Sequence, residues 1–66
     1  MLESDIKVTR QIEDRRIGEH DDIVSIIRVE FKVGNHGPFV ERFPKETYSA
    51  QVRDDKLNAF AREVRT

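Results

Sequence analysis

The chain has 66 residues and no cysteine, which excludes a disulfide framework and a cysteine-based zinc site. Charged residues make up 38% of the chain and apolar residues 36%, a balance too apolar for a disordered tail yet thin for a self-sufficient core. The net charge of −1 provides no overall basic field that would draw the chain to nucleic acid. We therefore expect one small domain over residues 1–66, and a core this thin favours association with another chain.

The chain contains no apolar run as long as a membrane span, and its first residues lack the apolar stretch of a secretion signal. We expect no membrane partner and a cytoplasmic or virion location. Residues Met1–Ser4 are expected to form a frayed end.

The first expected strand covers Asp5–Ile12, where apolar and polar side chains alternate with the period of a half-buried strand. Its apolar face begins at Ile6 and is interrupted by Arg10, and an extension through Arg15–Arg16 is left open. A turn is expected at Gly18–Asp21, because glycine accepts positive φ and aspartate side chains accept hydrogen bonds from nearby backbone donors.

The central strand is expected at Ile23–Val33, the most apolar stretch of the chain. From Ile27 onward, apolar and charged residues alternate strictly, which indicates one buried and one exposed face. The expected inner face carries Ile27, Val29, Phe31 and Val33, and the expected outer face carries Arg28, Glu30 and Lys32.

The pairing of the first two strands can be predicted from parity, because a slip of one residue sends a whole apolar set to the wrong face. With a four-residue loop, the predicted partners are Ile6 with Val33, Val8 with Phe31, Arg10 with Val29 and Ile12 with Ile27. A register shifted by two residues is the alternative.

A turn is expected at Gly34–Pro38, where two glycines, an asparagine and a proline fall within five residues. Phe39–Phe43 follows as a short edge strand, a position that tolerates a preceding proline. The final segment changes to helical spacing, with Ser49 as the expected N-cap and Thr47 as the alternative. Its apolar stripe comprises Val52, Leu57, Phe60, Ala61 and Val64.

These elements predict an α+β fold: a three-stranded antiparallel β-meander followed by one C-terminal α-helix packed on one sheet face. The predicted core consists of Ile6, Val8, Ile12, Ile27, Val29, Phe31, Val33, Phe39, Phe43, Val52, Leu57, Phe60 and Val64.

The polar residues of the turns do not match the pattern of a catalytic or metal-binding site. His20, Asp21 and Asp22 are adjacent, and His36 belongs to a different turn, so a solvated turn is favoured over a metal site. Ser25 lies within the central strand and belongs to no recognisable nucleophile motif. The glycines form no phosphate-binding loop. We therefore expect no enzyme activity, no cofactor and no metal.

Parity also places two charged residues, Arg10 and Glu41, on the inner face. They either lie near the sheet edges with their charged ends in water or pair across the central strand near Val29. The first arrangement is favoured, because the two outer strands are about 10 Å apart.

The outer sheet face is the most informative candidate for function, because three apolar residues are expected there among charges. Their exposure indicates a contact surface, unless they only reflect strand propensity or a bulge turns them inward. The predicted partner-binding residues are Val24, Ile26, Arg28, Val40 and Arg42. The other polar residues expected on this face are Lys7, Thr9, Gln11, Glu13, Glu30 and Lys32.

The element order strand–strand–strand–helix is similar to that of small DNA-binding domains at the front of some tyrosine recombinases and in a family of plant transcription factors. This resemblance implies that the exposed sheet face enters the major groove. The segments HGPF, RFPKETYSAQ and LNAFAREVR also resemble small proteins encoded in phage structural-gene clusters. That resemblance implies a virion component that contacts a larger subunit.

The leading interpretation is a non-catalytic protein–protein contact, in a homo-oligomer or as an accessory subunit of an assembly such as a phage particle. Nucleic-acid binding through the outer face is the alternative, and the net charge of −1 weighs against it. A small inhibitor or regulator that mimics a charged surface is the third interpretation.

Overall fold

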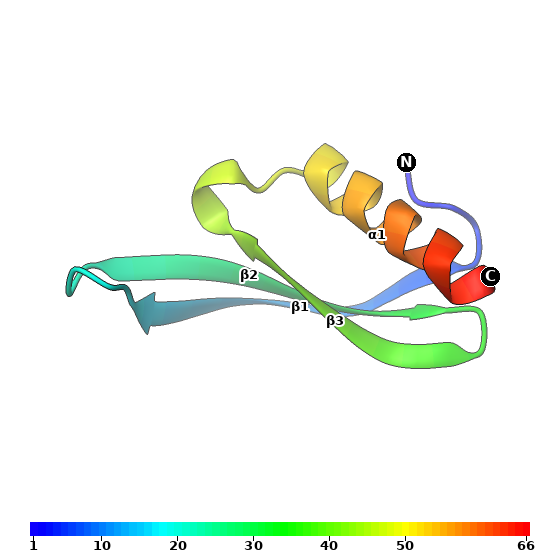
Figure 1. Ribbon diagram of the computed structural model, residues 1–66, viewed down its shortest axis with the longest axis horizontal. Coiled ribbons are helices and arrows are strands. Elements are labelled where there is room, and N and C mark those ends of the chain that lie inside the picture. The colour runs from blue at the N-terminus through cyan, green and yellow to red at the C-terminus, as the bar shows by residue number, and fades with distance from the viewer.

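The computed structural model describes all 66 residues and confirms the predicted order of elements. Three antiparallel strands form one sheet in the order β1-β2-β3, and a single helix follows (Figure 1). The elements are β1 (Ile6–Ile17), β2 (Ile23–Val33), β3 (His36–Pro44), a short 3-10 turn η1 (Lys45–Thr47) and α1 (Ala50–Arg65). The fold is therefore the α+β meander with a C-terminal helix that the alternation and the change of period predict.

The hairpin of β1 and β2 is much longer than the rest of the sheet. β3 ends where Pro44 pairs with Ile26, whereas β1 and β2 continue to the pair Ile17 and Ile23. We call this two-stranded extension, residues 15–25, the arm. It projects beyond the helix (Figure 1) and contributes to molecular extents of 40 × 20 × 19 Å.

The core lies between α1 and the inner face of the sheet. Val29, Phe31 and Leu57 are completely buried, and the rings of Phe39 and Phe60 pack against Phe31 at centroid distances of 5.8 and 5.4 Å. Aromatic contacts at such distances add to the stabilisation from burial alone. The eight buried residues are Ile6, Ile27, Val29, Phe31, Val33, Phe43, Leu57 and Ala61.

A β-bulge at Thr9 changes which residues of β1 face the core. The predicted pairs Ile6–Val33 and Val8–Phe31 are present, but the next residue to pair is Arg10, which lies opposite Glu30. Because one strand advances by two residues and the other by one, every later residue of β1 changes face.

The predicted pairs of Arg10 with Val29 and of Ile12 with Ile27 are therefore wrong, and so is the alternative register. Arg10 and Ile12 lie on the outer face, so Ile12 is not a core residue. Gln11 and Glu13 take the inner positions opposite Val29 and Ile27.

The turn between β2 and β3 is tighter than predicted. Val33 pairs with His36, so only Gly34 and Asn35 connect the strands, and β3 begins at His36 instead of Phe39. Gly34 adopts φ +57°, a conformation that side-chain-bearing residues rarely accept. Glu41 lies on the inner face opposite Val29, as parity predicts, and is half-buried.

The start of α1 is as predicted. The Oγ of Ser49 accepts a hydrogen bond from the backbone N–H of Val52 at 3.1 Å, which satisfies one of the free donors of the first turn. Thr47 instead belongs to η1. Val52, predicted as a core residue, is 41% exposed because it lines the open groove between α1 and β3.

The N-terminal residues are attached to α1, so the expectation of a frayed end is wrong. The backbone N–H of Glu3 donates to Oδ1 of Asn58 at 3.0 Å, and Leu2 packs against the core. At the end of the helix, Arg65 donates to Oδ2 of Asp5 at 2.9 Å and to Oε1 of Glu3 at 2.6 Å. The guanidinium of Arg65 thus joins the last turn of α1 to the chain just before β1.

The ion pairs of Arg65 with Asp5 and Glu3 should make the protein less stable in acid. The hydrogen bond from Arg65 holds the pKa of Asp5 below its ordinary value. A depressed carboxyl pKa contributes stability above the unfolded pKa of about 3.9, and that contribution disappears as the pH falls through the lower folded pKa. In thermal melts from pH 7 to pH 2, Arg65→Gln should lower the melting temperature at neutral pH and flatten the acid limb relative to Arg62→Gln. Identical acid limbs in the two variants would contradict this assignment.

Candidate interaction surfaces

The outer sheet face collects most of the cations of the sheet, because the bulge moves two further arginines onto it. Its charged residues are Lys7, Arg10, Asp14, Arg16, Arg28, Glu30, Lys32 and Arg42. Six cations and two carboxylates give this face a net charge of +4, whereas the whole chain carries −1, so the remaining residues carry −5. Positive and negative charge are therefore separated in the molecule. The overall charge of −1 reflects neither the positive outer face nor the negative remainder.

Like charges face each other directly at two places on this face. Lys7 lies opposite Lys32 where β1 pairs with β2, and Arg28 lies opposite Arg42 where β2 pairs with β3. Directly opposed like charges destabilise a sheet. Their repulsion would be relieved by any partner that places negative charge over the face.

Arg28 is the only one of these cations that has carboxylate neighbours. Its guanidinium lies 3.9 Å from Asp14 and 3.6 Å from Glu30, and its buried Nε has no hydrogen-bond partner. None of the other five has a carboxylate within 4 Å. The charge of those five is thus available to a ligand, whereas that of Arg28 is partly neutralised.

The apolar residues predicted for the outer face are located there. Val24 and Val40 are 36% and 42% exposed, and Ile26 is half-buried, because the bulge lies in β1 and leaves the faces of β2 unchanged. Ile12, which is predicted as a core residue, joins them from β1. The predicted surface residues therefore share one face, although contact with a partner stays a prediction.

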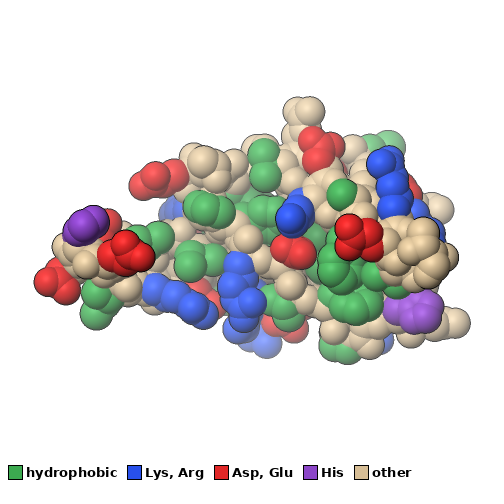
Figure 2. Space-filling model, viewed as in Figure 1, with side chains coloured by type: hydrophobic (Ala, Val, Ile, Leu, Met, Phe, Trp, Pro, Cys, Tyr) green, Lys and Arg blue, Asp and Glu red, His purple; other side chains and the backbone are tan.

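Basic side chains occur at both ends of the outer face of β1, with Ile12 and Asp14 between Arg10 and Arg16. Lys7 and Arg16 mark its ends, about 30 Å apart at 3.3 Å per residue. Figure 2 shows Lys and Arg side chains gathered along the lower side of the sheet, away from α1, and acidic side chains around the end of the arm.

Gln11 and Glu13, expected on the outer face, instead anchor the segment that links β3 to α1. The hydroxyl of Tyr48 donates to Oε1 of Gln11 at 2.8 Å, and Nζ of Lys45 lies 3.0 Å from Oε1 of Glu13. These contacts hold η1 and the following residues over the inner face. They are part of the scaffold and leave the outer face uncovered.

Two exposed isoleucines in the arm were not singled out from the sequence. Ile17 and Ile23 pair directly, on the side of the sheet that α1 covers elsewhere, and are 79% and 74% exposed. The sequence does carry a signal, since both isoleucines flank the turn at residues 18–22. Their position beside the turn indicates exposure only if β1 and β2 are known to extend past the end of β3.

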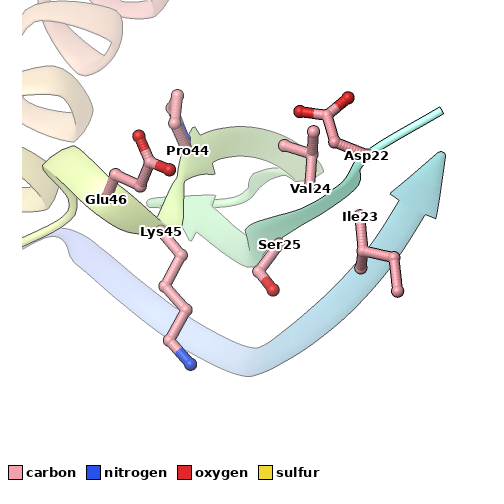
Figure 3. Close-up of a pocket in the computed structure, with 7 residues that line it drawn as sticks. All are labelled: Asp22, Ile23, Val24, Ser25, Pro44, Lys45 and Glu46. Atoms are coloured by element: carbon pink, nitrogen blue, oxygen red, sulfur yellow. The ribbon is translucent and has the colours of Figure 1, made fainter. Parts of the chain in front are cut away.

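A cavity of about 550 Å³ lies where β3 ends beside the arm (Figure 3). Its lining combines the edge of β2 at Val24 and Ser25 with Pro44, Lys45 and Glu46. The ammonium of Lys45 is held by Glu13, as described above. The cavity is a notch that results from the abrupt end of β3.

A second, more apolar groove of about 440 Å³ runs between β3 and α1. Phe43, Val52 and Ala59 provide its apolar lining, and Arg42 and Lys56 lie at its rim. Neither cation has a carboxylate within 4 Å. Asp55 also lines the groove, so two cations and one carboxylate surround its apolar residues and give the lining a net charge of +1.

The histidines lie in separate exposed turns, His20 in the arm and His36 at the start of β3. No group of three or more potential metal ligands comes together in the structure. The single long helix is neither apolar enough nor extended enough to cross a membrane.

Comparisons with models of protein families, with characterised proteins and with solved structures returned no match.

Proposed function

We propose that this protein is a non-catalytic binding module whose outer sheet face contacts the phosphate backbone of nucleic acid. The supporting observation is the concentration of positive charge on one face of an otherwise acidic chain, including two directly opposed like-charge pairs. The overall charge of −1 argues against nucleic acid only if charge is spread evenly, and here it is not.

The shape of the sheet is compatible with this proposal. The major groove of B-DNA is about 12 Å wide and admits a two-stranded β-ribbon, and the arm is such a ribbon. Free cations such as Arg10 and Arg16 would contact phosphates, which supply affinity without sequence information. Apolar side chains such as Val24 and Ile26 suit contact with thymine methyl groups. The element order, similar to that of sheet-based DNA-binding domains, agrees with this arrangement.

A titration of a labelled duplex tests the proposal. A duplex of about 20 base pairs, at 3.4 Å per base pair, exceeds the length of the basic face. We expect fluorescence anisotropy at low salt to show a dissociation constant below about 100 µM, since non-specific binders reach about 10⁻⁴ to 10⁻⁶ M even at physiological salt. The absence of binding at that concentration would overturn the proposal.

A protein partner is the second candidate, and the apolar residues of the outer face favour it. Four apolar residues lie among the charges of this face: Ile12, Val24, Ile26 and Val40. Burying such apolar area favours binding to a protein surface. The charge of the face would select an acidic partner, such as a larger subunit of an assembly in which this chain is an accessory component. A phage particle is one such assembly, and a cytoplasmic or virion location would follow from it.

A further inference from the structure

The inner face of the sheet is covered by α1 over only part of its length. Along the arm, the hairpin continues past the end of β3, and that part of the inner face is bare (Figure 1). Ile17 and Ile23 lie side by side there and remain largely in water. Removing such apolar surface from water is favourable, so this pair represents stabilisation that the monomer does not use.

The groove beside α1 has the complementary chemistry. Its apolar lining includes Val52, which is 41% exposed, and Arg42 and Lys56 at its rim have no ion pair. The arm ends in carboxylates. They belong to Glu19, Asp21 and Asp22, which are all exposed. An apolar projection with an acidic tip therefore matches an apolar groove whose lining, with Arg42, Lys56 and Asp55, carries a net positive charge.

We infer that the arm of one copy binds the groove of a second copy, and the reverse, in a two-fold symmetric dimer. A two-fold axis makes the two contacts identical, so each chain offers both its projection and its groove. Ile17 and Ile23 then contact Phe43, Val52 and Ala59 of the other copy. The helix of each copy covers the inner sheet face that the other copy leaves bare.

A second copy is the occupant that accounts for both surfaces together. An extended peptide from another protein would fill the groove but leave the isoleucines of the arm exposed. Reciprocal binding covers both in one event, and it stabilises a domain whose own core is small. Inner-face residues of the arm make this contact, whereas the arm and Arg42 also take part in the proposed binding to nucleic acid, so self-association is measured without a duplex.

Sedimentation equilibrium tests the dimer, with one pair of variants for the arm and one for the groove. Ile17→Thr with Ile23→Thr keeps β-branched residues and removes apolar contact, while Ala59→Glu places a carboxylate in the groove at an exposed helix position. We expect each variant to weaken self-association by at least about tenfold. Val40→Thr, on the outer face, is the matched control and should associate like the parent.

Mixing the variants distinguishes arm–groove binding from other dimers. The arm variant has an intact groove and the groove variant has an intact arm, so an equimolar mixture regains one of the two contacts. The mixture should therefore associate more tightly than either variant alone, with circular dichroism confirming that both are folded. A parent that stays monomeric up to about 1 mM, where weak interfaces still associate, would overturn the inference. So would a dimer that neither variant weakens.

Discussion

Replacing Leu57 by alanine should remove most of the stability of this domain. Leu57 is completely buried between α1 and the sheet, in the same cluster as Phe31 and Val29. Truncating a buried leucine costs about 2–5 kcal/mol, because apolar contact is lost and a cavity remains. At about 0.05–0.15 kcal/mol per residue, a chain this short has only about 3–10 kcal/mol to lose.

Thermal unfolding followed by circular dichroism measures this effect. We expect the melting temperature of Leu57→Ala to fall by more than about 10 °C, since each 1 kcal/mol shifts a domain of this size by about 4–8 °C. Gln51→Ala is the matched control, an exposed position on the same helix that should change stability by less than about 0.5 kcal/mol. Similar melting temperatures for the two variants would show that α1 does not cover the sheet.

Removing two arginines from the outer face should greatly reduce the affinity for a duplex. If the five unpaired cations each neutralise one phosphate, the logarithm of the binding constant falls with the logarithm of salt concentration at a slope of about −4.5. Between 50 and 200 mM salt, affinity would then drop about 500-fold. Arg10→Gln with Arg16→Gln should weaken the slope by about two.

The arm supplies a matched control for this prediction. Arg15 and Arg16 are adjacent, but Arg15 lies opposite Ser25 on the inner side, and Arg16 lies opposite Val24 on the outer side. Arg15→Gln with Arg62→Gln therefore removes the same charge from the other side of the molecule. An equal loss of affinity in both double variants would mean that only overall charge matters.

Much of the fold follows from local pattern. The alternation in β2, the change to helical spacing and the cap at Ser49 each depend on residues close in sequence, and the structure confirms all three. The register of β3 against β2 also agrees with the alternation, since Phe39 and Phe43 lie opposite Phe31 and Ile27.

The bulge at Thr9 could not be predicted by the same reasoning. Parity assumes that both strands advance together, and one extra residue reverses every later assignment. The one indication of a bulge in the sequence is Arg10, a charged residue at a predicted inner position. On the outer face it is exposed, so the bulge avoids burying that charge.

This reversal also explains why the surface was predicted only in part. The five predicted contact residues lie where β2 and β3 have no bulge, so they occupy the expected face. They are Val24, Ile26, Arg28, Val40 and Arg42. The added positive charge comes from Arg10 and Arg16, which depend on the bulge. The polarised surface is thus a property of the pairing and not of the composition.

Lysine modification in the presence of a duplex tests whether the outer face is the side that contacts nucleic acid. Lys7 and Lys32 lie opposite each other on the outer face, whereas Lys56 lies on α1. With each site followed by mass spectrometry, saturating duplex should slow the modification of Lys7 and Lys32 and leave Lys56 at its free rate. Protection of Lys56 while Lys7 and Lys32 stay fully reactive would show that the duplex does not bind the outer face.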